Sequence, residues 1–433
     1  MSGGVGGGGT QSAPDPIVGS NRIKSNGRTR FKGRPRGTAP TWQTHVPGRI
    51  VSFNIMEKQI LICAGEPSGD ALGAGVIRSL LSMDGALHIR GLGGRMMATA
   101  GAELDYLFDG RSAMGLSELA SDTGFWLKTW AGLSASCMRQ RPDVAILVDF
   151  PEFNMALARV LKAFDVPVIW YVSPQVWAWR AGRVKTLGRL CERIALILPF
   201  EEELYHSAGV RHAEYVGHPL MDMKIPSRTE ARRMLDIDKG KRVIAMLPGS
   251  RHHEIGSHLE TLVSAGSELG EKYGALILLP VAPGLNSQST DYIRQSTAPC
   301  FRLVNTNDSS ASVSALAAAD AALVCSGTAT LTAALCRTPF AAFYKAGDLT
   351  YLAGRLFIKS RYLALPNIIM NTRTVPELLQ QAFTAEKLVS ACESLFDPGI
   401  RAFQKDSFAQ LEKILKKPGA AKRVATMILE TVR

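Results

Sequence analysis

The stretch LVCSGTATL, Leu323 to Leu331, joins an apolar run to a helical pattern through small residues. The apolar run predicts a buried strand, and the pattern after it predicts a helix. The first backbone N–H groups of such a helix have no intrahelical partner, and they suit a phosphate. We therefore expect phosphate binding at Ser326, Gly327, Thr328, Ala329 and Thr330.

Apolar runs and helical patterns alternate from residue 58 onward. Continuous apolar runs predict buried strands, and 3.6-residue periodicity between them predicts helices. The strands are expected at 59–65, 142–149, 166–172, 242–249, 275–281, 321–327 and 340–345. This alternation predicts βαβ units in parallel sheets, an α/β fold class.

A polar, charged stretch at 220–240 divides the alternation in two. We expect an extension at 1–55, a Rossmann-like βα domain at 56–225 and a second one at 226–433. Helical patterns from about residue 384 predict that the second domain ends in helices.

The first 55 residues are basic and rich in glycine. They hold eight Lys and Arg residues against Asp15 alone, so they carry +7 of the formal net charge of +12. The remaining +5 weakens a nucleic-acid function for the rest of the chain. The lack of apolar periodicity predicts disorder in the extension. Three origins stay open: an Arg-rich organelle transit peptide, a basic arm, or upstream sequence before a true start at Met56.

The seven cysteines are scattered and form no CxxC pair. They indicate a reducing compartment with the thiols acting as small apolar groups. No apolar run reaches the roughly 18 to 20 residues that span a bilayer. We expect a soluble or peripheral protein.

The loop GEPSGD (65–70) follows the first predicted strand, at the edge where open α/β sheets bind ligands. Gly65 and Gly69 permit tight turns, and Ser68 or Asp70 can cap the next helix. An ordinary strand-to-helix turn is the alternative to a binding loop.

The loop VDFPEFN (148–154) puts Asp149 at the carboxyl end of a buried strand. Partial desolvation would raise the pKa of Asp149 and make it a candidate general base. The alternative role for Asp149 is a helix cap.

The segment YVSPQVWAWR (171–180) places Tyr171, Trp177 and Trp179 within ten residues. Two indoles near a strand end could line an apolar or sugar-binding surface, or they could pack in the core.

The loop LPGSR (247–251) follows the first strand of the second half. Backbone N–H groups of Gly249 and Ser250, with the guanidinium of Arg251, could clamp a diphosphate. A solvated Arg after a turn is the alternative.

Motifs for metals and dinucleotides are incomplete. GLGG (91–94) lacks the third glycine of GxGxxG, and HEIGSH (253–258) places its histidines at i and i+5, on different faces of a helix. We expect no metal and no cofactor, so that Arg and helix dipoles must meet the charge of a leaving group.

Segments throughout the chain resemble lipid A disaccharide synthases in order and spacing. They are AGEPSGDALGAGVI (64–77), VDFPEFN, YVSPQVWAWR, LPFE (198–201), VGHPL (216–220), LPGSR, SGTATL (326–331), LPNIIM (365–370) and VPELLQ (375–380). The resemblance covers residues 57–433. It implies a GT-B glycosyltransferase with two Rossmann-like domains facing across a cleft.

The resemblance also implies the reaction. UDP-2,3-diacylglucosamine and 2,3-diacylglucosamine 1-phosphate would give a β(1→6) disaccharide 1-phosphate and UDP, with inversion at the donor carbon. One displacement then needs a base for the acceptor 6-hydroxyl and cations for the departing UDP.

Site residues follow from the resemblance by motif. Asp149 matches an essential aspartate whose simplest role is that of the base, and Arg251 matches an arginine near the donor diphosphate. Ser326, Gly327 and Thr328 match the loop for the nucleotide phosphates, and Asn367 would lie at the interdomain cleft. The other substrate-binding candidates are Glu66, Ser68, Gly69, Asp70, Gln175, Trp177, Arg180, Gly249, Ser250, Ala329 and Thr330.

Two positions depart from the family pattern. Thr332 replaces a glutamate expected to bind the nucleotide ribose, and a threonine cannot accept from two hydroxyls at once. The family's GGPRM is GGRMM here beside Arg95, for which we expect only a local loop change.

Acylated substrates imply a peripheral protein at the inner face of a bacterial inner membrane, with a homodimer as one option. A genuine transit peptide would instead imply a mitochondrion. Phe125, Trp126, Trp130 and Leu133 have helical spacing near Lys128. This face could dock on a bilayer and accept acyl chains, or it could be buried against the N-terminal domain.

Two other functions stay open at this point. A UDP-sugar 2-epimerase of the same fold would act on soluble sugars and need no apolar acceptor surface. A basic-armed protein that binds RNA or anionic membrane would depend on residues 1–55.

Overall fold

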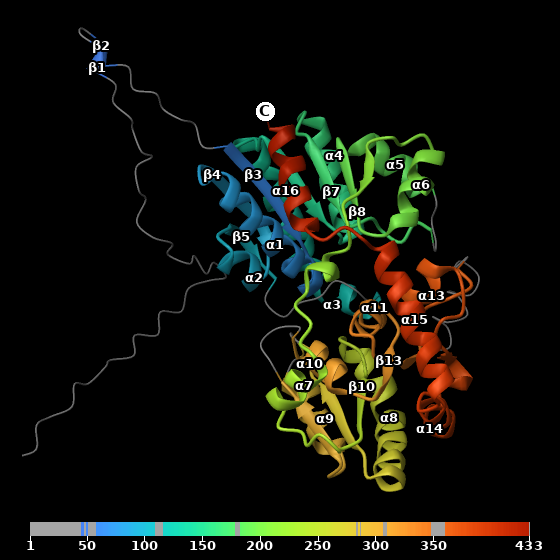
Figure 1. Ribbon diagram of the computed structural model, residues 1–433. Helices are drawn as coiled ribbons and strands as arrows, with labels where there is room; N and C mark the ends of the chain where they lie inside the picture. The colour runs from blue at the N-terminus through green and yellow to red at the C-terminus, as the bar shows by residue number, and fades with distance from the viewer. Residues whose placement is uncertain are drawn as a thin grey trace, which may run out of the picture. The chain divides into compact units, whose positions relative to one another are not determined.

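The computed structural model describes residues 45–46, 49–50, 58–108, 116–177, 182–282, 285, 287–305, 310–347 and 360–432 (Figure 1). The chain divides into residues 1–55 and 56–433. In the first unit β1 (His45–Val46) and β2 (Arg49–Ile50) pair antiparallel. Apart from these two strands, residues 1–57 lie outside the described part of the chain. The expected disorder of residues 1–55 and the possible start at Met56 therefore stay predictions.

The first half of the body forms a seven-stranded parallel sheet in the order β5-β4-β3-β6-β7-β8-β9. The predicted strands 59–65, 142–149 and 166–172 are confirmed as β3 (Lys58–Ala64), β6 (Val144–Val148) and β7 (Val168–Tyr171). Four further strands, which are shorter or interrupted by polar and glycine residues, were not predicted: β4 (Leu87–Gly93), β5 (Glu103–Leu107), β8 (Arg193–Leu196) and β9 (Ala213–Tyr215).

Helices cover both faces of this sheet. Side chains of β3 alternate between two apolar clusters, with Leu61 and Cys63 in one and Ile60 and Ile62 in the other. The first cluster includes α3 (Leu116–Arg139), α4 (Pro151–Ala163), α5 (Arg183–Leu190) and α6 (Pro199–Ser207). The second includes α1 (Pro67–Met83) and α2 (Arg95–Thr99). Burial on both faces explains why the central strands read as continuous apolar runs.

The second half forms a six-stranded parallel sheet in the order β12-β11-β10-β13-β14-β15. Its strands are β10 (Val243–Leu247), β11 (Leu276–Pro280), β12 (Phe301–Val304), β13 (Ala321–Cys325), β14 (Phe340–Tyr344) and β15 (Glu377–Leu379). The four runs predicted here correspond to β10, β11, β13 and β14. In both sheets the chain therefore alternates strand and helix, as the sequence predicts.

Helices also cover both faces of the second sheet. One apolar cluster includes α7 (Arg228–Met234), α10 (Ser310–Ala318), α11 (Thr328–Leu335), α13 (Leu365–Met370) and α15 (Pro398–Ile414). The opposite cluster includes α8 (His252–Tyr273) and α14 (Ala385–Ser394). The remaining elements are α9 (Ser287–Ser296) and the short helices η1 (Pro219–Asp222) and η2 (Gln380–Ala382).

The last helix, α16 (Ala420–Thr431), returns to the first sheet and lies beside α1 (Figure 1). Val424 and Ile428 are fully buried in the same cluster as Ile60 and Ile62. The C-terminal helices are thus divided between the two sheets. Within the described residues, no helix combines the length and the apolar character that a membrane crossing requires.

Candidate functional site

Asp149 lies at the carboxyl end of β6, in a turn with two consecutive left-handed residues. Its φ is 46° and that of Phe150 is 52°. The amide of buried Asn154 donates to the carbonyl oxygens of Asp149 (2.7 Å) and Val148 (3.3 Å). Pro151 then begins α4. The left-handed conformation of the turn costs free energy, which these bonds offset.

Phe150 anchors the same turn in the core. Its ring lies 5.0 Å from that of Trp126 and 5.1 Å from that of Phe153. A side chain at Gly65 would meet this ring, because an added Cβ would lie 2.3 Å from it. Gly65 is therefore required where β3 and β6 end side by side.

Two carboxyl groups meet at this edge, Glu66 after β3 and Asp149 after β6. Burial raises the pKa of Asp149 to about 6, against a hydrogen bond from the Phe150 N–H and the charge of Arg251. Burial raises the pKa of Glu66 to about 7, with a contribution from Asp149 and an opposite one from Arg251. Near neutral pH Asp149 is mostly ionised, as a base must be, whereas Glu66 holds a proton about half of the time.

Glu201 is a third buried carboxyl group, which the sequence analysis did not select as a site residue. It accepts a hydrogen bond from the Leu198 N–H at 3.1 Å. Burial raises its pKa to about 8, and hydrogen bonds and the charge of Asp149 modify that shift. Its place in LPFE, directly after β8, is the signal that could have identified it.

Arg251 approaches these carboxylates from the second sheet. Burial alone would lower its pKa, but the carboxylates of Glu254 and Glu66 reverse the shift and raise it. The structure therefore brings Arg251 within electrostatic reach of Glu66 and Asp149. A cation from one sheet thus faces a candidate base from the other.

Glu254 holds the loop that carries Arg251. Its carboxylate accepts from the N–H groups of Ser250 (2.9 Å) and Arg251 (3.2 Å) and from the Arg251 guanidinium (3.0 Å). Gly249 has φ 123°, and a Cβ there would lie 2.5 Å from Glu254 Oε2. The expectation that the Ser250 N–H clamps a diphosphate needs correction, because the Glu254 carboxylate already occupies it.

The loop at the start of α11 divides into anchoring and exposed parts. Ser326 Oγ donates to the Leu363 carbonyl at 2.9 Å, and Thr330 Oγ1 donates to the Gly327 carbonyl at 2.7 Å. Gly327 has φ 138° and is exposed together with Thr328, while Ala329 is half-buried. The two hydroxyls fix the loop, and the backbone of Gly327, Thr328 and Ala329 is left as the candidate phosphate contact.

Thr332, where a glutamate was expected, is buried. Its Oγ1 donates to the Thr328 carbonyl one turn earlier, at 3.3 Å. A hydroxyl used in this way is not presented to a ribose.

Asp70 and Asn367, two of the predicted substrate contacts, both form hydrogen bonds within the protein. The Asp70 carboxylate accepts from the N–H groups of Gly94, Met96 and Met97, at 2.8 to 2.9 Å, where α2 begins. Asn367 is fully buried, and its amide holds residues 374–377 through four hydrogen bonds. The four bonds use both donors and both acceptor sites of the Asn367 amide, whereas the Asp70 carboxylate keeps one acceptor site.

The other two candidates of the first loop differ from each other. Ser68 is exposed in the first turn of α1. Gly69 is buried, and its missing side chain lets α1 approach β3, since a Cβ would lie 3.2 Å from that of Ala64. Gly69 is therefore a packing residue.

The segment after β7 is described only in part. Gln175 is exposed, and the half-buried indole of Trp177 meets the Phe200 ring edge-on at 5.6 Å. Arg180 and Trp179, also predicted here, lie outside the described residues.

The aromatic face of α3 is buried. Trp126 and Leu133 belong to the core of the first sheet, and Phe125 and Trp130 pack against it. Of the two alternatives for this face, the structure shows burial against the N-terminal half. Among the large apolar side chains that the structure describes in α3, Leu127 is 64% exposed and Met138 is 57% exposed.

The fold is shared with nucleotide-sugar enzymes. UDP-GlcNAc 2-epimerase from Neisseria meningitidis, bound to UDP-GlcNAc, superimposes with a TM-score of 0.60 at 13% identity, over 87% of this chain and 100% of that one. The calicheamicin glycosyltransferase CalG4 gives 0.54 at 13% identity, over 87% and 99%. The two sheets thus form the GT-B fold, which confirms the predicted fold class.

Sequence similarity is more specific. The lipid-A-disaccharide synthase of Syntrophus aciditrophicus is 38% identical over 381 residues, which cover 87% of this chain and 98% of that protein. The lipid-A-disaccharide synthetase family profile matches residues 60–426. The chain therefore belongs to the lipid-A-disaccharide synthetase family, and it is an enzyme, a glycosyltransferase of lipid A biosynthesis.

Proposed function

We propose that the protein joins UDP-2,3-diacylglucosamine to 2,3-diacylglucosamine 1-phosphate in a single inverting displacement that needs no metal. The observation that carries this proposal is the pairing of Asp149, at a strained turn of the first sheet, with Arg251 of the second. Asp149 would then act as the base for the acceptor hydroxyl, and Arg251 as the cation for the diphosphate leaving group.

Asp149 takes the proton of the acceptor 6-hydroxyl as that oxygen bonds to the donor C1. The bond between C1 and the UDP oxygen breaks, and UDP leaves with the electron pair. Arg251 and the backbone N–H groups at the start of α11 stabilise the charge that develops on the diphosphate. Because burial raises the pKa of Glu66 toward neutrality, its protonated form can also donate a hydrogen bond to a substrate oxygen.

The other two functions raised by the sequence have less support. The likeness to UDP-GlcNAc 2-epimerase is one of fold alone, at 13% identity. A basic-armed binding protein would leave the carboxyl groups and Arg251 without a role.

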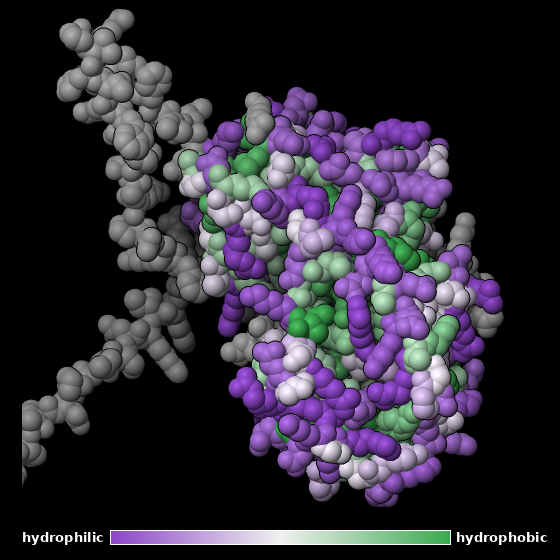
Figure 2. Space-filling view, in the orientation of Figure 1, coloured by the Kyte–Doolittle hydropathy of each residue, from purple (hydrophilic) through white to green (hydrophobic). Residues whose placement is uncertain are grey.

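We place the enzyme at a membrane surface on the cytoplasmic side of a bacterial cell, without spanning it. The exposed Leu127 and Met138 of α3 are eleven residues apart, about three turns, and therefore share a face. The exposed Lys128 and Arg139 lie beside them. Hydrophilic residues cover most of the face seen in Figure 2, with only small apolar patches. The narrow apolar and basic stripe that these four residues of α3 form suits weak, reversible attachment to anionic lipid.

The test is disaccharide formation from the two acylated glucosamine substrates in detergent, with a chelator present. We expect turnover by the wild type and a loss of about 100-fold or more in Asp149→Asn. Asp143→Asn is the matched control, because Asp143 lies at the opposite end of β6 and bonds the Gln59 N–H at 2.7 Å. Equal activity of both variants would contradict a role for Asp149 as the base.

The pH profile gives a second measurement. The base must be unprotonated, so kcat/KM should fall about tenfold per pH unit below pH about 6, the pKa of Asp149. Arg251 lowers that pKa, so Arg251→Ala should move the acid limb to higher pH as well as lower the rate. An acid limb that stays in place in this variant would show that the two groups are not coupled.

A further inference from the structure

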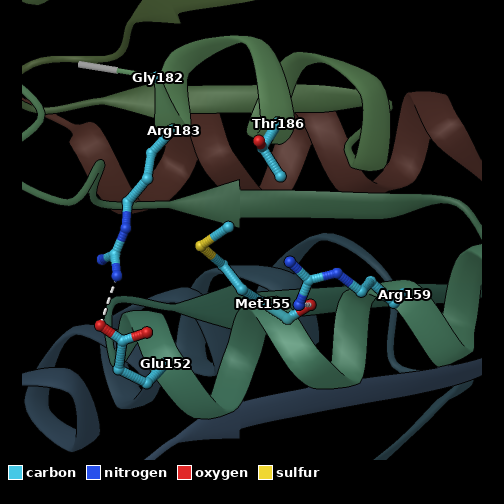
Figure 3. Close-up of a pocket in the computed structure, with 6 residues that line it drawn as sticks. All are labelled: Glu152, Met155, Arg159, Gly182, Arg183 and Thr186. Atoms are coloured by element: carbon cyan, nitrogen blue, oxygen red, sulfur yellow. Dashed lines mark hydrogen bonds and ion pairs between the residues drawn. The ribbon is translucent and has the colours of Figure 1, made fainter. Parts of the chain in front are cut away.

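A pocket of about 430 Å³ lies between α4 and α5, beside the turn formed by Asp149 and Phe150 (Figure 3). It is lined by Glu152, Met155, Arg159, Gly182, Arg183 and Thr186. None of these residues belongs to the proposed donor site or is the proposed base. The volume is within the range of small-molecule sites.

One wall of the pocket comes from α4. Glu152, Met155 and Arg159 have the spacing i, i+3 and i+7, which places them on one side of the helix. α4 begins at Pro151, so its Glu152 end is the one nearest to Asp149. The pocket thus extends from the turn of Asp149 and Phe150 along α4.

The opposite wall comes from the start of α5. The Arg183 guanidinium forms an ion pair with Glu152, and its side chain is only 13% exposed. Arg159 Nη1 donates to the Met155 carbonyl at 3.2 Å, which holds this guanidinium at the other end. In Figure 3 Arg183 and Thr186 extend from α5, and Met155 and Arg159 from α4, toward the same space.

The charges of the lining favour an anion. The lining carries two guanidinium groups and one carboxylate, so its net charge is positive. Each guanidinium has five N–H donors. The Thr186 hydroxyl adds a donor, and Met155 gives an apolar surface between the polar ends. A single guanidinium group can bind two oxygens of a phosphate monoester in parallel.

We propose that this pocket binds the phosphate monoester of the acceptor lipid, an assignment that rests on the proposed function. The acceptor must present its 6-hydroxyl to Asp149 while its 1-phosphate, at the other carbon bonded to the ring oxygen, is held nearby. The Glu152–Arg183 end of the pocket lies on the same turn-and-helix element as Asp149. A sugar placed across that end has its phosphate among cations and its hydroxyl at the base.

The experiment compares acceptors with and without the phosphate. We measure kcat/KM for 2,3-diacylglucosamine 1-phosphate and for 2,3-diacylglucosamine in the wild type, Arg159→Gln and Arg183→Gln, together with KM for the UDP-sugar. Arg189→Gln is the matched control, because Arg189 is an exposed arginine of α5 outside the pocket lining.

We expect the preference for the phosphorylated acceptor to fall at least about tenfold in each pocket variant, with an unchanged KM for the UDP-sugar. The preference should be unaffected in Arg189→Gln. Arg159 is exposed, so Arg159→Gln tests the proposal even where Arg183→Gln fails to fold. An unchanged preference in Arg159→Gln would overturn it.

One further measurement distinguishes an acceptor-phosphate site from a lipid-headgroup site. A headgroup phosphate of the bilayer has the same chemistry, so we also measure sedimentation with phosphatidylglycerol vesicles. Variants that lose vesicle binding but keep the acceptor preference would overturn the proposal in favour of a headgroup site. A wild type that forms disaccharide while its pocket variants keep the preference refutes the pocket alone, whereas a wild type without turnover refutes the proposed function.

Discussion

At the residue scale, the turn at Asp149 and Phe150 shows how the fold positions the candidate base. Neither residue is glycine, and a left-handed residue of this type costs about 1 to 3 kcal/mol. The bonds from Asn154 and the packing of Phe150 on Trp126 offset this cost. The surrounding bonds and packing therefore hold the left-handed backbone of Asp149 and Phe150 in place.

Asn154→Ala should release the turn. Loss of the amide bonds at a fully buried position should lower the free energy of unfolding by about 1 to 3 kcal/mol and reduce kcat, because Asp149 is then less well placed. Chemical denaturation and steady-state kinetics measure the two effects. Asn367→Ala is the matched control, since Asn367 is equally buried but bonded within 367–377. It should destabilise the protein to a similar extent without moving the acid limb at pH about 6.

The polar residues at the strand ends could be identified from the sequence, but their hydrogen-bond partners could not. Asp149 and Arg251 could be selected because strand ends in parallel sheets meet at one edge. Asp70 and Asn367 look the same in sequence, yet their polar atoms bond backbone groups that approach only in the fold, such as the Gly94 N–H for Asp70. Glu201 lies in LPFE, after a short strand that the sequence did not predict, and its burial in the fold identifies it.

At the scale of elements, the start of α8 is organised around Glu254. Its carboxylate replaces solvent as the partner of the loop N–H groups and of the Arg251 guanidinium. The helix and the candidate diphosphate clamp are thus fixed by one side chain.

Glu254→Gln should raise KM for the UDP-sugar by about 3- to 30-fold, because a neutral amide holds Arg251 less firmly. The KM for the acceptor should change little. Glu260→Gln, on the exposed side of the same helix, is the control for the loss of one negative charge. Equal changes in both KM values would mean that Glu254 supports the whole fold and not the donor loop.

The central strands were predictable because helices bury them on both faces, which demands continuous apolar sequence. The edge strands β5 and β9 carry mixed sequence because one edge meets solvent. β5, for example, has exposed residues at Glu103 and Asp105. Their existence depends on pairing with a neighbour, which no local pattern reports.

At the scale of the whole molecule, the chain passes between the two sheets twice. It leaves the first sheet after β9 and returns to it through α16. The sequence indicated helices in the tail, but it could not place α16. Nothing local distinguishes an apolar stripe that packs on α1 from one that packs on the second sheet.

Deletion of residues 420–433 should prevent the first sheet from folding stably. Val424, Met427 and Ile428 are buried at 0 to 1% exposure. Each contributes about 1.5 to 3 kcal/mol, a sum comparable with the roughly 5 to 15 kcal/mol of a whole domain. Thermal unfolding followed by circular dichroism measures the loss. Deletion of residues 1–55 is the control, and it should leave both the unfolding midpoint and turnover unchanged; equal melting of the two truncated proteins would contradict the role given to α16.

The two passages between the sheets are joined to each other. Arg423 donates to the Val216 carbonyl at 2.7 Å, and Lys417 Nζ donates to the Tyr215 carbonyl at 3.1 Å. Gly217, with φ 95°, leaves no room for a side chain, because a Cβ there would lie 2.1 Å from the Lys417 carbonyl oxygen. Two chain segments strapped together at one point act as a single pivot. If the two sheets move relative to each other when substrate enters, this joint is the fixed point about which we expect them to turn.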